Sequence, residues 1–190
     1  MTGNPEVLPS WPAGHIILDS EAATLWALLG ATATDGGLWP EQLFTRMSAQ
    51  TYSAQTTLQN DTVFTFAGVA SAAYVFMIDG QYVTNATALF KIAWTGPTGA
   101  GGTWHDGGFP TSVTASSSGS VNMGTTAVFG STHTLGTNGS NTAFHGAGYI
   151  TIGATAGNVT FQHAQNVSNG SGGATTGMLA GSWLSVKRVL

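Results

Sequence analysis

The sequence predicts an all-β fold built from antiparallel strands, either a sandwich or a barrel. Three observations lead to this prediction. From Tyr52 onward apolar and polar residues alternate with a period of two, turns rich in Gly, Ser and Asn interrupt the alternation at short intervals, and no helical pattern separates the strands. Strands without intervening helices are not the βαβ units of a parallel sheet. The expected strands cover residues 52–58, 62–67, 73–83, 87–95, 112–122, 125–134, 143–153, 158–166 and 181–189.

Residues 1–51 have a different composition and are predicted to form a leader that precedes a β-domain of residues 52–190. The leader holds five of the eight acidic residues and four of the six prolines. Asp19 or Ser20 can cap a short helix that runs to Leu29, because the leucines of this stretch recur at i, i+3 and i+4. A second short segment, residues 40–47, can pack beside that helix.

The large apolar residues of the leader have two alternative roles. They can dock on the β-domain and complete its core, because one short helix does not bury its own apolar stripe. Alternatively, they can attach the protein to a larger particle. In that case the anchoring residues are Trp11, Trp26, Leu29, Trp39 and Phe44.

The composition favours a folded chain that associates with copies of itself. Charged residues make up 6% of the sequence, against roughly 25% in an average soluble domain. Six Trp, nine Phe and four Tyr provide ample material for a core, so disorder is not expected. A neutral polar surface gives little electrostatic protection against association, and we therefore expect a homo-oligomer.

Charge and hydropathy exclude several kinds of partner and site. Four basic residues against eight acidic ones do not favour nucleic-acid binding, which requires clustered Lys and Arg. The apolar runs are far shorter than the ~20 residues that span a bilayer, and the N-terminus has no basic and apolar signal regions. With no cysteine, neither disulfides nor thiolate metal sites are expected.

The last strands are expected to pack against the core or against another subunit. In residues 158–166 one face carries Phe161 and His163, and in residues 181–189 large apolar groups lie on both faces. A strand that is buried on both faces is central in its sheet or is covered by a neighbouring subunit. The residues predicted to make these contacts are Phe161, His163, Trp183, Leu184 and Val186.

Four stretches, in order, resemble a known family: SAQTTLQNDTVFTFAG, ALFKIAWTGPTGAGGTW, GYITIGATAGNVTFQHAQNVSN and LAGSWLSVKRV. Together they are similar to the β-domain of virion structural proteins from tailed bacteriophages of actinobacteria, described as minor tail, head-fibre or capsid decoration proteins. The stretch PSWPAGHIILDSEAATLWALLGA resembles the short leader of this family. The similarity covers about residues 9 to 29 and 52 to 189.

This resemblance implies a jelly-roll β-sandwich of the tumour-necrosis-factor or C1q type, usually trimeric about a three-fold axis, and display on the virus particle. It implies no catalytic residue and no cofactor. The chain departs from the family pattern in the Gly/Ser/Thr stretch at 107–140 and in the Asn/Gly-rich insert at 166–177.

Chemistry by metal ions or by paired carboxylates has little support in the sequence. Five histidines, His15, His105, His133, His145 and His163, lack the short spacing of a zinc site apart from the adjacent pair His105 and Asp106. If histidines formed a metal-binding ring on a three-fold axis, His163 would be the first candidate. The β-domain holds only three carboxylates, Asp61, Asp79 and Asp106, and they follow no glycosidase pattern. Neither a nucleophile elbow nor a phosphate-binding loop with its Lys is present. No metal or catalytic residue is expected.

Two functional hypotheses remain. The first is a virion structural protein, assembled in the host cytoplasm, that decorates the capsid as a trimer and contacts the major capsid protein; a minor tail or fibre protein that touches the host surface is the nearest alternative. The second is a carbohydrate-binding module in which aromatic rings stack on sugars. The aromatic residues proposed for such contacts are Trp104, Phe109 and Tyr82.

Overall fold

The computed structural model describes residues 16–19, 24–27, 41–112, 122–137, 139, 141–168 and 175–189. Every regular element in these ranges is a β-strand, which confirms the predicted all-β class. The chain divides into two units, one formed by residues 1–40 and the other by residues 41–189.

In the first unit the described residues form a strand pair. β1 (Ile16–Asp19) and β2 (Thr24–Ala27) are antiparallel, with Ile17 opposite Trp26. The helix predicted to run from Asp19 to Leu29 is therefore wrong over Thr24–Ala27. β-branched and aromatic residues favour extended backbone, and a helix this short has little stability of its own.

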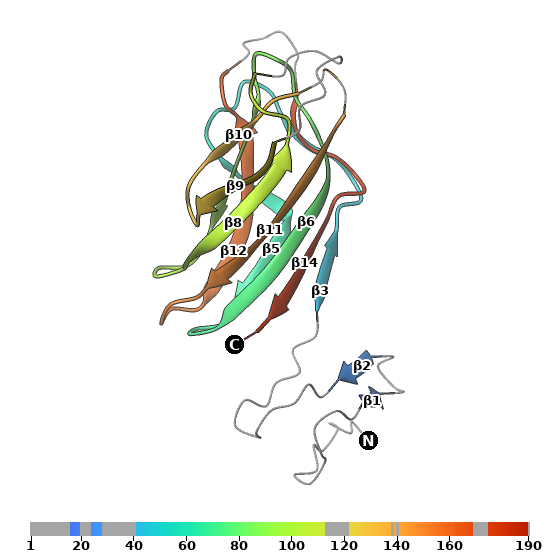
Figure 1. Ribbon diagram of the computed structural model, residues 1–190, viewed down its shortest axis with the longest axis vertical. Helices are drawn as coiled ribbons and strands as arrows, with labels where there is room; N and C mark the ends of the chain where they lie inside the picture. The colour runs from blue at the N-terminus through green and yellow to red at the C-terminus, as the bar shows by residue number, and fades with distance from the viewer. Residues whose placement is uncertain are drawn as a thin grey trace. The chain divides into compact units, whose positions relative to one another are not determined.

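The second unit consists of two antiparallel sheets that face each other, as a sandwich requires (Figure 1). The four-stranded sheet has the order β10 (His133–Leu135), β7 (Phe90–Thr95), β12 (Gly157–Gln165), β5 (Gln59–Gly68). The eight-stranded sheet has the order β3 (Gln42–Thr45), β14 (Trp183–Arg188), β6 (Ala73–Val83), β11 (Thr142–Thr151), β8 (Gly101–Gly108), β9 (Asn122–Val128), and β13 (Thr176–Met178) joins β4 (Gln50–Tyr52) to β6.

The core lies between the two sheets and is rich in aromatic residues. It is built by strict alternation, as in β6, where Phe76 and Ile78 are buried while Val75 and Met77 are exposed. Each fully buried large apolar side chain contributes about 1.5–3 kcal/mol. Its largest members include Phe64, Phe90, Trp94, Phe144 and Phe161.

Most of the predicted strands are present, with boundaries within a few residues. The strand at 73–83 coincides with β6, and the strands at 62–67, 87–95, 143–153, 158–166 and 181–189 correspond to β5, β7, β11, β12 and β14. Residues 53–58 are not a strand, because only Gln50–Tyr52 pairs there. The strand predicted at 125–134 is two elements, β9 and β10. The strand predicted at 112–122 falls largely on residues outside the described part of the chain.

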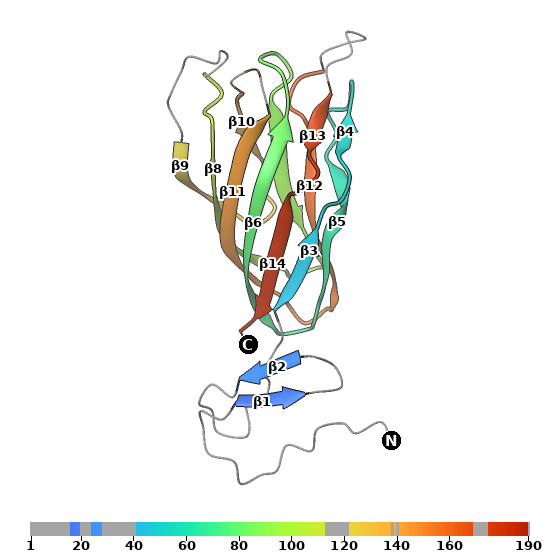
Figure 2. The same cartoon turned by 90° about the vertical axis from the view of Figure 1, so that its right-hand side faces the viewer.

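Two short strands from the predicted leader belong to the sandwich. β3 pairs with β14, and β4 pairs with β13, so the β-domain begins at residue 41 and not at residue 52. Phe44 of β3 packs against the core. Figure 2 shows β3 beside β14, at the side of the sheet that continues through β6 and β11.

Candidate functional site

The outward side of the eight-stranded sheet carries several exposed apolar side chains. We call it the outer face. Its rows run across the strands through cross-strand partners: Leu43, Ser185, Met77 and Ala147 in one row, and Lys187, Val75, Tyr149 and Thr103 in the next.

The apolar residues of the outer face are unusually exposed. Leu43 is 67% exposed, and Met77, Tyr149 and Val75 are 43%, 44% and 41% exposed. Val128 of β9, opposite Thr103, extends the row and is 63% exposed. Single exposed apolar residues are ordinary on a protein surface, whereas a contiguous set across one sheet marks an interaction surface.

Few charges interrupt the outer face. Asp79 and His145 are cross-strand partners, and the Nδ1 atom of His145 lies 3.0 Å from Oδ2 of Asp79. Trp183 is the neighbour of Asp79 on the other side and is partly buried. The pair places a polar, hydrogen-bonded group on a mostly apolar surface, and such a group can determine how a partner is aligned on that surface.

A buried ionic cluster lies inside the second unit. Arg46 follows β3, Asp61 lies on β5 and His163 lies on β12. The side chains of Asp61 and His163 have no exposed area, and that of Arg46 is 2% exposed. Arg46 donates a hydrogen bond to Asp61 through Nη2, and its guanidinium lies 5.1 Å from the ring centroid of Phe64.

The environment of Asp61 favours its ionised form. Burial raises the pKa of this carboxyl, but the contact with His163, the backbone N–H groups of Phe64 and Val63, and Arg46 all lower it, and the net pKa lies below its ordinary value of 3.8. Both N–H groups donate to Oδ1 at 2.8 Å. Nε2 of His163 is 3.3 Å from Oδ2 of Asp61, but this contact lacks hydrogen-bond geometry. We therefore regard Arg46 and the backbone donors as the principal partners of Asp61.

The ionic cluster has a structural role, because its side chains are almost completely buried and are not accessible to a ligand. Arg46 also donates to Oε1 of Gln50 at 3.1 Å, and the ring of Tyr52 lies 5.2 Å from that of His163. These contacts tie β3 and β4 to the four-stranded sheet. They help to hold β3 on the sandwich.

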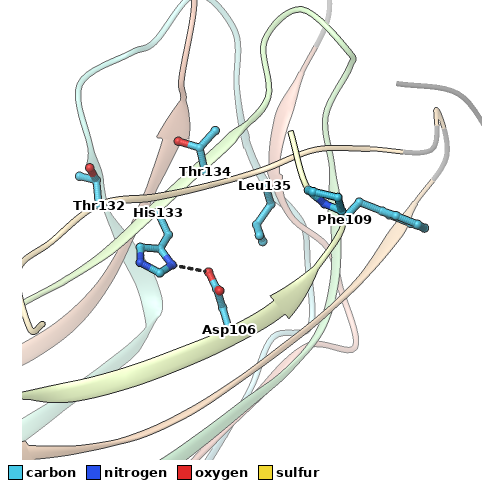
Figure 3. A pocket seen from close by; sticks show the side chains of 7 residues that line it. Asp106, Phe109, Thr132, His133, Thr134 and Leu135 are labelled. Atoms are coloured by element: carbon cyan, nitrogen blue, oxygen red, sulfur yellow. Dashed lines mark hydrogen bonds and ion pairs between the residues drawn. The ribbon is translucent and has the colours of Figure 1, made fainter. Parts of the chain in front are cut away.

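A pocket of about 210 Å³ opens at the edge where β10 approaches β8. At its base Nδ1 of His133 and Oδ2 of Asp106 are 2.9 Å apart and point toward one another (Figure 3). The side chain of Asp106 is 4% exposed and that of His133 is 15% exposed. The pocket is lined by Asp106, Phe109, Pro110, Thr132, His133, Thr134 and Leu135.

The Asp106–His133 pair connects the two sheets. Asp106 and Trp104 alternate with the exposed His105 on β8, so their side chains face the interior of the sandwich. The ring of Trp104 lies 5.0 Å from that of His133. Burial raises the pKa of the nearby Tyr82, whose hydroxyl donates to the carbonyl of Gly136 at 2.5 Å. The base of the pocket is thus polar and hydrogen-bonded.

The residues predicted to contact sugars are mostly inaccessible. Trp104 is 2% exposed and Tyr82 has no exposed area, so neither ring can stack on a ligand at the surface. The prediction assumed exposed rings, but both residues lie on the inward side of their strands. Phe109 is partly exposed and borders the pocket.

The residues predicted to pack in the core or between subunits divide into two groups. Phe161, His163, Leu184 and Val186 are buried within the chain. Trp183 is on the outer face and only partly buried. β14 lies between β3 and β6, as expected for an interior strand, but its outward side carries Ser185 and the exposed Lys187.

The predicted anchor residues lie mainly outside the described part of the chain. Trp11, Leu29 and Trp39 fall there, as does the side chain of Trp26. Phe44 is described and belongs to the sandwich.

In the described part of the chain, no three His, Asp or Glu side chains converge as metal ligands would. His163 is enclosed in the core, and therefore it does not reach a surface where a three-fold ring could form.

Sequence reasoning did not identify the two polar clusters. Arg46, Asp61 and His163 are far apart along the chain and follow no motif, and the same holds for Asp106 and His133. One signal was available, since a lone carboxylate in an otherwise apolar, alternating strand requires a partner. Asp61 in QNDTVFTF is such a residue.

Comparison with known protein families, with curated proteins and with solved structures finds no match for this chain. Within the described ranges, no helix has the length and apolar character needed to cross a bilayer.

Proposed function

We propose that this protein is a structural component of a bacteriophage virion that assembles through the outer face. The observation that carries the proposal is the set of exposed apolar side chains on one face of the eight-stranded sheet, in a chain with 6% charged residues. Covering these residues with a sister chain would bury apolar surface at roughly 25 cal/mol per Å². Their rigid placement on paired strands reduces the ordering entropy that association costs.

A sister chain fits this face better than a strongly charged partner does. The face presents charges of both signs: Asp79, which is paired with His145, and Lys187, with the row of Met77 and Ser185 between them. Two copies packed against each other can bring Asp79 of one near Lys187 of the other. A face with a single sign of charge would repel its copy instead.

The finer features of the proposal come from the resemblance in sequence. They are a jelly-roll arrangement of the strands, a trimer, an N-terminal segment that attaches the protein to the particle, and a position on the capsid. The alternation of the chain between two sheets in this sandwich is compatible with a jelly roll. A minor tail or fibre protein that contacts the host surface is the alternative position.

Two measurements test this function. Size-exclusion chromatography with light scattering should give the mass of an oligomer at micromolar concentration, and a monomer would contradict assembly through the outer face. Quantitative gel analysis of purified virions should give a copy number in the hundreds for a capsid protein. A few copies would instead place the protein in the tail, and its absence from virions would reject the virion role.

A further inference from the structure

We propose that the pocket at Asp106 and His133 is a binding site for one neutral sugar ring. Three properties carry this inference: the size of the pocket, the polar groups at its base and the apolar groups beside them. The proposed binding site does not depend on assembly through the outer face, because Asp106 is on the inward side of β8.

The size limits the ligand. A volume of about 210 Å³ is below the roughly 300–1,000 Å³ of pockets for drug-sized molecules. It suits a single six-membered ring with its substituents. A nucleotide or a peptide segment would extend well beyond it.

The polar groups suit hydroxyl groups. A carboxylate accepts several hydrogen bonds, and His133 accounts for one at Asp106. The second ring nitrogen of His133 can donate or accept. The exposed Thr132 adds a hydroxyl at the rim, and the partly exposed Thr134 adds a second hydroxyl, which donates to Oδ1 of Asn166 at 3.3 Å. Vicinal hydroxyls of a sugar are both donors and acceptors, so they match this mixture.

The apolar groups suit the C–H face of the same ring. Phe109, Pro110 and Leu135 line the pocket together with the polar groups. In Figure 3 the side chain of Leu135 points toward the Asp106–His133 pair, whereas that of Phe109 extends away from it. Sugars present apolar C–H faces and polar edges, and protein sites for them combine aromatic or aliphatic surface with a few fixed polar groups.

Other ligand classes fit less well. A phosphate or sulfate would meet the buried carboxylate of Asp106, and no Lys or Arg lines the pocket to offset that repulsion. A purely apolar ligand would remove water from Asp106 without replacing its hydrogen bonds. An amine is attracted to the carboxylate, but His133 already pairs with it.

Saturation-transfer NMR and calorimetry with methyl glucoside, methyl galactoside, methyl mannoside and N-acetylglucosamine test the proposal on the full chain. At least one should bind saturably, with a Kd on the order of millimolar. Asp106→Asn should weaken binding about tenfold or more, and Phe109→Ala about fivefold. Immobilised oligosaccharides compared with the free sugars show whether the ligand is an isolated sugar or the end of a glycan.

The control is His105→Ala, which alters the adjacent residue on the opposite side of β8 and should leave sugar binding unchanged. Because Asp106→Asn also removes a contact between the sheets, Thr132→Val at the exposed rim is a second variant, and circular dichroism checks the fold of each. Two results would overturn the site: no saturable binding of any of these sugars at tens of millimolar, or equal binding by the parent chain and both Asp106→Asn and Phe109→Ala. Tighter binding of methylammonium or Ca²⁺ than of every sugar would assign the pocket to a cation instead.

Discussion

At the level of single residues, the second unit depends on two pairs of polar side chains that bridge its layers. Arg46 and Asp61 are fully enclosed, whereas Asp106 and His133 border a pocket. The enclosed pair has lost its hydration and depends on the hydrogen bonds that replace it. The pair at the pocket keeps partial access to water, so it is free to exchange a water contact for a ligand.

Removing one member of the enclosed pair should destabilise the protein severely. Arg46→Met leaves the carboxylate of Asp61 buried without its cation, and we expect a loss of about 3–5 kcal/mol in the free energy of unfolding. The double variant Arg46→Met/Asp61→Leu replaces the pair by apolar side chains and should recover part of this loss, because the N–H groups of Val63 and Phe64 lose their acceptor at Asp61. Urea unfolding of the parent, both single variants and the double variant measures the coupling. Equal losses in the single and double variants would show that Arg46 does not compensate Asp61.

Asp61 should also produce a defined dependence of stability on pH. Its pKa in the folded protein lies below the ordinary 3.8, so the folded state binds this proton less readily than the unfolded state. The resulting stabilisation is fully present above the unfolded pKa, and it is lost as the pH falls through the folded pKa. Urea midpoints measured from pH 6 downward should fall below pH 4, and Asp61→Asn should flatten this slope. Identical slopes would assign acid sensitivity to other carboxylates.

At the level of elements, the sequence predicts strands well where alternation is dense and poorly where glycine interrupts it. YVFMIDGQYV identifies β6 because buried and exposed residues alternate along it. β8, GGTWHDGG, was missed because four of its eight residues are glycine and its inward positions include Asp106. β3 and the first two residues of β4 fall in the predicted leader because strands of four and three residues carry no visible period.

The candidate binding surfaces can likewise be predicted from the sequence only where local alternation reveals them. The exposed positions of β6 and β11 could be read from alternation, but the outer face as a whole requires knowledge of which strands are neighbours. The pocket is even harder to predict from the sequence, since it lies between β8 of one sheet and β10 of the other. Long-range pairing decides such sites, and a local pattern carries no information about it.

Gly102 of β8 is required by its close approach to β11. A Cβ added at Gly102 would lie 2.1 Å from the carbonyl oxygen of Tyr149, and its φ of 138° is rarely adopted by other residues. Gly102→Ala should therefore lower the free energy of unfolding by about 3 kcal/mol or more. At the adjacent Gly101 the nearest atom would be Oγ1 of Thr151 at 3.7 Å. Gly101→Ala is the matched control and should change stability by less than about 1 kcal/mol. Comparable thermal melts for the two variants would contradict the predicted clash.

At the level of the whole molecule, the two faces of the eight-stranded sheet serve different purposes. Its inward side completes an aromatic core, and its outward side leaves Leu43, Val75, Met77 and Tyr149 exposed. Burial within one chain cannot explain these outward residues. One face of this sheet is buried in the core, and the other exposes apolar side chains. Such a protein stays soluble only if association covers the exposed face or if the rest of the surface keeps it in solution.

The last prediction separates association from folding. Met77→Asp places a charge at the centre of the outer face, on β6, where its cross-strand neighbours are Ser185 and Ala147. The side chain is already exposed in the single chain, so the fold should tolerate the change, whereas an interface would have to bury an unpaired carboxylate at a cost of about 2–5 kcal/mol. Light scattering should therefore find a folded monomer, with the circular dichroism spectrum of the parent. Val69→Asp, at a residue 46% exposed in the turn after β5, should leave the oligomer intact. If Met77→Asp keeps the parent mass while Val69→Asp dissociates it, the subunit contact lies elsewhere than on the outer face.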